Sequence, residues 1–190
     1  MGEWLDIWNK DYLVNVKPRT LESYRCQIKN HIQPELGAVK MESLNAPTIQ
    51  HFYNSLSKKG LAPKTVKIIH GVLHEALRQA VAVGYLRVNP SDSCTLPRIV
   101  KKQVKPLDDD AIREFLKEIH GHRFELLYLV TLFTGLREGE VLGLAWDRVD
   151  FDKGTLLIDQ QLQQAKDESG KRQYGLVSLK NDRWRRITPA

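Results

Sequence analysis

Arg137 and Glu140 are the charged residues whose types and spacing most directly suggest chemistry. An apolar helical run ends at Gly135, and a second short helix is expected to begin directly after it. Residues three apart on a helix are neighbours, so Glu140 can take one side of the Arg137 guanidinium and leave the other for an external anion. Because Arg137 precedes Val141 by four residues, we expect it near the buried edge of the helix. The alternative is a purely structural Arg–Glu pair in a helical hairpin.

The sequence around Arg137 resembles the first conserved box of the tyrosine recombinases, which are the integrases of phages and transposons. In that family the arginine contacts the scissile DNA phosphate and the glutamate supports the arginine. The resemblance therefore implies that Arg137 is catalytic and that Glu140 supports it. The matching residues are Thr134, Gly135, Leu136, Arg137, Glu140, Val141, Leu144 and Trp146.

Lys180 is the second catalytic candidate that the resemblance implies. It follows a predicted strand and precedes a polar turn and the tail Arg-Arg-Ile-Thr-Pro at 185–189. This order is similar to the β-hairpin box of the family, in which a lysine is followed by a polar turn and then Arg-x-[Ile/Val]-Pro. The turn here is not the usual one rich in Lys, Ser and Thr, so Arg183 is an alternative for the same register. A lysine at this place can donate a proton to the leaving oxygen as general acid; the alternative is a solvated hairpin lysine.

The reaction that the resemblance implies is strand exchange in double-stranded DNA recombination sites. A tyrosine hydroxyl attacks a backbone phosphate and yields a 3′-phosphotyrosine and a free 5′-hydroxyl, while arginine forks neutralise the developing charge. No cofactor, metal or small-molecule substrate is implied, and full-length members act as a tetramer on two DNA sites. The His-x-x-Arg box and the nucleophilic tyrosine would lie beyond Lys180, and the chain stops at Ala190. We therefore expect a truncated integrase that is inactive alone.

The first hundred residues predict four amphipathic helices and no strand. The second is expected to begin at Pro18 or Thr20 and to be ended by Pro34 and Gly37. The first covers residues 3–12, the third follows an Asn45 cap and Pro47, and the fourth runs from Pro63 to about Val83 with Val66, Ile69, Leu73, Leu77, Ala80 and Val81 buried. This pattern predicts a small helical bundle, and it resembles the SAM-like core-binding domain of phage integrases.

Two of these helix starts combine cations, hydroxyls and free backbone N–H groups, a combination that favours phosphate. Thr-x-x-x-Tyr and Lys-Thr-x-x helices are common in the core-binding domain of the resembled family. The alternative is that these residues are ordinary caps and surface charges. His70 and His74 also have metal-ligand spacing, but with no third ligand nearby we predict no metal site. The candidate DNA-binding residues are Lys17, Arg19, Thr20 and Tyr24 at the first start, and Lys64, Thr65, Lys67 and His70 at the second.

The predicted fold class is mainly α with a small antiparallel β-sheet. A four-helix SAM-like bundle at 1–98 is followed by a basic linker at 99–106 and by an incomplete α+β integrase catalytic domain at 107–190. We expect Lys101 and Lys102 to lie along a DNA backbone; the alternative is a solvated tether. In the second domain we expect a helix capped by Asp108, a helix at 123–133, and strands either side of a tight turn at 152–154. A polar hairpin loop at 160–172 and a third strand at 174–179 complete the prediction.

Composition narrows the function classes. The chain has 190 residues and a net charge of +6, with 13 basic and 8 acidic residues in 1–100 against 16 and 15 in 101–190. A basic surplus in one half fits contact with nucleic acid. The absence of an apolar run of membrane length and of a signal sequence predicts a cytoplasmic protein without membrane contact. Two function classes remain beside the recombinase: a non-catalytic DNA-binding fragment that occupies sites or regulates a full-length integrase, and a helical interaction module that binds no DNA.

Overall fold

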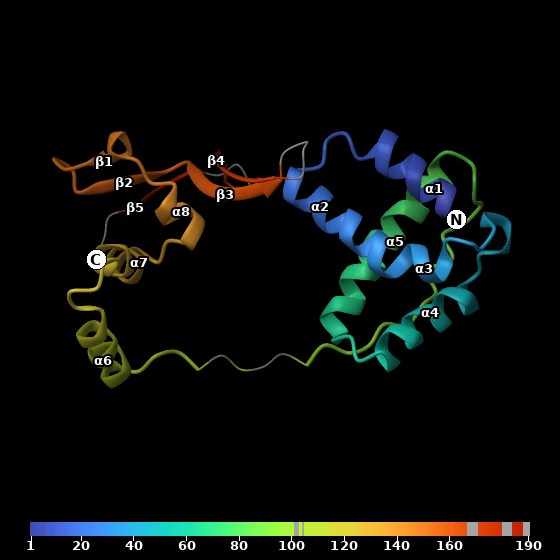
Figure 1. Cartoon of the computed structure of the whole chain (residues 1–190), viewed down its shortest axis with the longest axis horizontal. Helices are drawn as coiled ribbons and strands as arrows, with labels where there is room; N and C mark the ends of the chain where they lie inside the picture. Colours follow the sequence, from blue (N-terminus) through green and yellow to red (C-terminus); the bar gives the residue numbers. More distant parts are fainter. Residues whose placement is uncertain (101–102, 104, 167–170, 180–183, 188–190) are drawn as a thin grey trace. The chain divides into compact units, whose positions relative to one another are not determined.

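The computed structural model of the chain describes residues 1–100, 103, 105–166, 171–179 and 184–187. The chain divides into two compact units, Met1–Lys102 and Gln103–Ala190, and the boundary falls inside the segment predicted as a linker (Figure 1). Lys101 and Lys102, which were predicted to lie along DNA, are outside the described residues. No helix within the described ranges combines the length and the apolar character needed to span a bilayer.

The first unit contains four continuous helical segments within its described residues, as predicted. The prediction that Pro34 ends the second segment was wrong. Pro34 lies in the first turn of α3, which directly follows a π-helical stretch. A missing backbone N–H is tolerated in the first turn of a helix. The segments are α1 (Gly2–Ile7) continued by η1 (Trp8–Tyr12), α2 (Pro18–Gln27) continued by η2 (Ile28–Ile32) and α3 (Gln33–Leu36), α4 (Ala46–Lys58) and α5 (Pro63–Ala82), with a 3-10 turn η3 (Met41–Ser43) before α4.

The core of this unit is built on α5. Trp4 of α1 donates its indole N–H to the Ala76 carbonyl of α5 at 3.0 Å, which ties the first helix to the last. The Asn45 side chain caps α4 by accepting from the Thr48 N–H at 2.9 Å, as predicted. Val81 is half-buried rather than buried, because the buried face of α5 is centred on other residues of the helix. That face is Val66, Ile69, Val72, Leu73, Ala76, Leu77 and Ala80.

The second unit combines short helices with two small antiparallel sheets. As predicted, Asp108 caps the first of these helices through the Ala111 N–H. One sheet has the order β1-β2-β5 and the other pairs β3 with β4. The elements are α6 (Asp109–Ile119), α7 (Glu125–Thr134), α8 (Glu138–Leu142), η4 (Trp146–Arg148), β1 (Val149–Asp150), β2 (Thr155–Ile158), β3 (Gln160–Lys166), β4 (Arg172–Ser178) and β5 (Arg185–Ile187).

The predicted hairpin loop at 160–172 was wrong for most of its length. Residues Gln160–Lys166 form β3, which pairs in register with β4 from Gln160 opposite Ser178 to Lys166 opposite Arg172. The segment has glutamines at four of its seven positions and shows no alternation of apolar and polar residues. Its extended structure comes from the backbone ladder, which a pattern of side-chain hydrophobicity does not reveal.

α8 lies directly against the backbone of β3. A Cβ atom on Gly143 would lie 2.7 Å from Gln161 Cα and 2.7 Å from the Leu162 nitrogen, and one on Gly139 would lie 3.0 Å from the Leu162 carbonyl oxygen. Gln160 in turn donates its side-chain amide to the Gly143 carbonyl at 2.9 Å. The two glycines therefore permit the close contact that fixes α8, and Glu140 with it, on β3.

Substitution Gly143→Ala should lower the free energy of unfolding of the second unit by about 1–3 kcal/mol, because the added methyl group meets backbone atoms that cannot rotate away. Gly175→Ala is the matched control in the neighbouring strand, where an added Cβ meets no atom within 4 Å. Urea unfolding, monitored by hydrogen exchange of the β3 backbone amides, measures the difference in unfolding free energy between the two variants. Equal stabilities of the two variants would contradict the close packing of α8.

Candidate active site

Arg137 lies at the junction between α7 and α8. Gly135 ends α7 in the left-handed conformation with φ 63°, as predicted, and the buried Leu136 anchors the turn. Arg137 then has extended backbone angles, φ −73° and ψ 152°, and is the N-cap of α8. The prediction that it faces the buried edge of the helix was wrong, because the helix begins only after it. Its side chain is 78% exposed.

Glu140 is the buried member of the pair. Its side chain is only 4% exposed, and it accepts hydrogen bonds from Arg137 on both oxygens. The Arg137 backbone N–H donates to Oε2 at 2.9 Å, as the third residue of a capping box does, and Nη1 donates to Oε1 at 2.9 Å. The guanidinium is thus held on one side by Glu140 while most of its surface faces solvent.

Arg185 of β5 binds the same carboxylate. Its Nη1 donates to Glu140 Oε1 at 3.2 Å and its Nη2 to Oε2 at 2.6 Å. Sequence reasoning did not assign this residue to the site. A signal was present, because Arg185 and Ile187 match the Arg-x-[Ile/Val] part of the pattern that follows the family's lysine, although Thr188 intervenes before the proline.

Arg137, Glu140 and Arg185 form a charged cluster whose charges do not cancel. Burial by itself raises the pKa of Glu140, but the hydrogen bonds from Arg185 and then from the Arg137 backbone and side chain outweigh burial, and the pKa lies below its usual value. Glu140 is therefore ionised at neutral pH. Two guanidiniums share one carboxylate, which leaves one positive charge beside a solvent-exposed fork. Such an arrangement attracts an anion.

Lys180 and its alternative Arg183 lie outside the described residues, so their roles stay predictions. The described chain reaches Leu179, which follows β4 and is 5% exposed in the core of the second unit. Leu156, Ile158 and Leu136 form the rest of that buried cluster. The strand that leads to Lys180 is therefore anchored in the same core as the turn that carries Arg137.

The predicted DNA-binding residues of α2 differ in exposure. Arg19 and Thr20 are exposed in the first turn, which follows Lys17 as the N-cap residue. Tyr24 is half-buried, and its ring stacks on Trp8 with a centroid distance of 5.8 Å and an interplanar angle of 15°. Its ring therefore contributes to packing within the helical unit, and its predicted DNA contact remains a prediction.

The predicted DNA-binding residues at the start of α5 also differ in exposure. Lys64 and Lys67 are exposed and Thr65 is half-buried. His70 is half-buried, its Nδ1 lies 2.9 Å from the Tyr53 hydroxyl, and burial lowers its pKa. His74 bonds instead to Asp92 at 2.8 Å. Because both histidines have partners inside this unit, the exposed lysines are the stronger candidates for phosphate contact.

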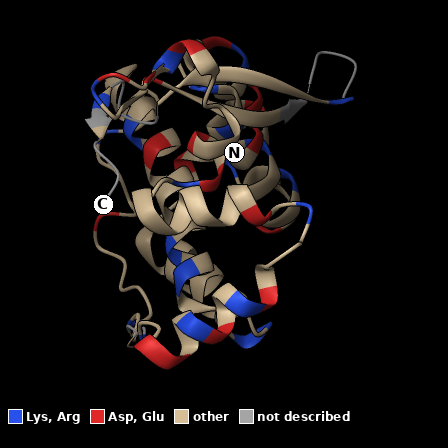
Figure 2. Cartoon of the chain, turned by 90° about the vertical axis from the view of Figure 1, so that its left-hand side faces the viewer, with Lys and Arg blue, Asp and Glu red and all other residues tan. Residues whose placement is uncertain are grey.

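Charge distribution alone does not mark a DNA-binding face. Lys and Arg residues are spread over the elements and interleaved with Asp and Glu residues (Figure 2). The two helix starts are distinguished instead by exposed cations, which are Arg19 in α2 and Lys64 and Lys67 in α5.

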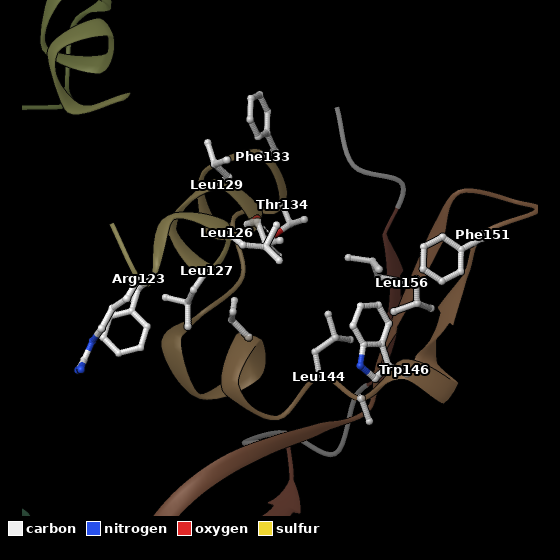
Figure 3. A pocket seen from close by; sticks show the side chains of 15 residues that line it. Arg123, Leu126, Leu127, Leu129, Phe133, Thr134, Leu144, Trp146, Phe151 and Leu156 are labelled. Carbon is white, nitrogen blue, oxygen red and sulfur yellow. Dashed lines mark hydrogen bonds between the residues drawn. The ribbon is translucent and has the colours of Figure 1, made fainter. Parts of the chain in front are cut away.

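An apolar groove of about 860 Å³ is the other notable surface of the second unit (Figure 3). It lies between α7, the end of α8 and the β1–β2 hairpin. Leu126, Phe133, Trp146 and Phe151 line it and are between 53% and 79% exposed. Arg123 and Thr134 are its polar side chains within the described residues, so it lacks the converging polar groups of a small-molecule site.

Comparison with known proteins gives matches over both units. Residues 1–57 match the family model of the phage integrase N-terminal SAM-like domain. A tyrosine recombinase XerC-like protein of Caldanaerobacter subterraneus subsp. tengcongensis is 32% identical over 93% of this chain and 48% of its own length. An integrase of Saccharopolyspora erythraea is 29% identical over 84% of this chain and 37% of its own. The chain belongs to the tyrosine recombinase family.

Solved integrase structures share the fold of this tyrosine recombinase chain. The Tn1549 transposon integrase in complex with transposon right end DNA matches with a TM-score of 0.83 at 22% identity, over 98% of this chain and 60% of that one. A lambda integrase dimer bound to a COC' core site matches with a TM-score of 0.69 at 22% identity, over 92% and 61%. The chain spans about half the length, or less, of the curated relatives that it matches.

Substitution Glu140→Gln should cost about 1–3 kcal/mol of unfolding free energy at neutral pH, because two guanidiniums lose their counter-charge. Since folding lowers the Glu140 pKa, its stabilisation is complete above the ordinary value of 4.5 and is lost as the pH falls through the folded-state pKa. Below about pH 4.5 the wild-type chain should therefore lose stability more steeply than the variant. Glu118→Gln, on the exposed face of α6, serves as control. Parallel pH profiles of wild type and Glu140→Gln would contradict the ionised, buried carboxylate.

Proposed function

We propose that this chain is the DNA-binding N-terminal portion of a site-specific recombinase that cuts and rejoins DNA through a phosphotyrosine intermediate. Arg137 binds the scissile phosphate, and Glu140 holds Arg137 in place. The observation that carries the proposal is the half-satisfied Arg137 guanidinium, which contacts Glu140 through Nη1 while 78% of its side chain is exposed. An ordinary surface pair exposes both partners, as Arg113 and Asp110 do at 75% and 90%, whereas here an exposed guanidinium is held by a carboxylate that is 4% exposed.

The chemistry of the proposed site follows from the charge on the phosphate. Attack by a tyrosine hydroxyl builds negative charge on the non-bridging oxygens, and a preorganised guanidinium stabilises that charge without reorganising at the moment of reaction. The planar fork of arginine suits two oxygens of one phosphate better than the single ammonium of lysine. Lys180 would then protonate the leaving 5′ oxygen as general acid. The tyrosine and the His-x-x-Arg box would be supplied by the part of the family fold beyond this chain.

The helical unit would hold the duplex through its phosphates. Arg19 and Thr20 in the first turn of α2, and Lys64 and Lys67 at the start of α5, are exposed cations and a hydroxyl. The contact is proposed for their side chains, because the N–H groups of Thr20 and Thr65 already donate to the carbonyls of Lys17 and Ala62 at 2.9 and 2.8 Å. α2 and α5 also pack on each other, so the two helix starts belong to the same compact unit. Contacts of this kind position a protein on DNA without reading its sequence.

The paired substitution Lys64→Ala and Lys67→Ala should weaken duplex binding to a similar degree for different sequences. The slope of the logarithm of affinity against the logarithm of salt concentration should fall in magnitude by about 2, since two phosphate contacts are lost. Lys10→Ala with Lys40→Ala removes the same charge from other exposed positions and is the matched control. Fluorescence anisotropy over a salt series measures both quantities. Identical slopes for the two paired variants would contradict the placement of the DNA contact, and no salt-dependent binding at all would favour a helical interaction module.

A suicide DNA substrate tests the recombinase proposal directly. The chain mixed with a C-terminal piece that carries the His-x-x-Arg box and the tyrosine should form a covalent protein–DNA adduct, whereas the chain alone should form none. Arg137→Lys should reduce the adduct about a hundredfold or more, because one positioned donor to the phosphate contributes on that scale. Gel separation of the adduct measures the yield. DNA binding without an adduct under both conditions would favour the alternative, a non-catalytic fragment that occupies recombination sites or regulates a full-length integrase.

A further inference from the structure

Two arginines from different elements of the second unit share one buried carboxylate, but they bind it differently. Arg185 of β5 uses both terminal nitrogens, one on each oxygen of Glu140. Arg137 uses only Nη1 from its guanidinium and fills the remaining place on Oε2 with its backbone N–H. Each oxygen thus accepts two hydrogen bonds, and Arg185 has the stronger, bidentate geometry.

The side chains of Arg185 and Arg137 also differ in exposure. The Arg185 side chain is 39% exposed, half the value for Arg137. Arg185 also sits opposite Ile158, which is 2% exposed, so the β2–β5 ladder fixes its backbone beside the core. Arg185 is therefore held by the sheet and points its fork at Glu140, while Arg137 stands at the rim of the site.

The bidentate contact of Arg185 limits how Arg137 can bind Glu140. A carboxylate whose two oxygens are open would draw the Arg137 guanidinium into a bidentate pair, the most favourable arrangement for two such groups. That pair would be neutral, and its fork would no longer face solvent. With Arg185 already bound across both oxygens, Arg137 keeps a single side-chain contact, and the cluster keeps one net positive charge.

We propose that Arg185 is a positioning residue for Arg137. By binding both oxygens of Glu140 with its two terminal nitrogens, Arg185 keeps most of the Arg137 guanidinium accessible to an anionic oxygen. The inference rests on the proposed role of Arg137 in binding a DNA phosphate, and it adds which residue keeps the Arg137 guanidinium accessible to that phosphate. Arg185 acts through Glu140 and needs no contact with DNA.

The test follows the Arg137 Nε–Hε resonance by nitrogen-15 NMR while inorganic phosphate is titrated into the 190-residue chain. Arg185→Gln should move this resonance before phosphate is added, because Arg137 turns onto Glu140. The phosphate midpoint should then rise roughly tenfold, the scale of one charge-assisted hydrogen bond. Arg148→Gln is the matched control, since Arg148 is an equally partnered arginine of the same unit, bonded to Asp159 at 3.0 Å and to Asp147 at 2.8 Å. Its substitution should leave the Arg137 titration unchanged.

Arg185→Lys separates positioning from charge and from folding. This variant keeps the charge but has no fork, so its phosphate midpoint should stay closer to that of Arg185→Gln than to that of the wild type. Full recovery by Arg185→Lys, or an unchanged Arg137 response in Arg185→Gln, would overturn the positioning role while leaving the proposed function intact. A wild-type Arg137 resonance that does not respond to phosphate would overturn both, because the anion site itself would then be absent.

Discussion

The second unit depends on one carboxylate being taken out of water and fully bonded. Glu140 is 4% exposed and receives four hydrogen bonds from the described part of the chain, one from a backbone N–H and three from two guanidiniums. A buried carboxylate with fewer partners would be costly, because an unpaired charge in a low-dielectric site loses its hydration without compensation. The bonds that remove this cost also join α8 to β5 and fix the residue that stands at the entrance of α8.

The surrounding backbone is shaped to make that burial possible. Gly135 reverses the chain after α7, and Gly139 and Gly143 let α8 approach the backbone of β3 more closely than a side chain would permit. Glu140 lies between the latter two glycines in the sequence, so its carboxylate is brought to the place that the Arg185 fork reaches from β5. A rigid carboxylate in turn places Arg137 without enclosing it. An arginine kept in this way can neutralise a phosphate in the transition state without a reorganisation cost.

Much of this arrangement could be predicted from the sequence, and the parts that could not have physical reasons. The four helical segments, the caps at Asn45 and Asp108 and the left-handed Gly135 follow from local patterns of apolar residues and cap residues. The spacing predicts the Arg137–Glu140 pair but not the exposure of Arg137, because sequence patterns place helix ends only to within a few residues and α8 begins one residue after Arg137. The strand β3 and the Arg185 contact depend on pairing between distant segments, which no local window of sequence contains.

The apolar groove and the charged cluster of the second unit differ in what they offer a partner. The groove presents Leu126, Trp146 and Phe151 without converging polar groups, whereas the cluster presents one net positive charge at an open fork. We propose that a DNA phosphate completes the hydrogen bonding of the Arg137 guanidinium. A structure of the chain bound to a short duplex should show a phosphate oxygen about 3 Å from an Arg137 side-chain nitrogen, with the Nη1 contact to Glu140 retained. An Arg137 turned fully onto Glu140, with the phosphates bound elsewhere, would contradict it.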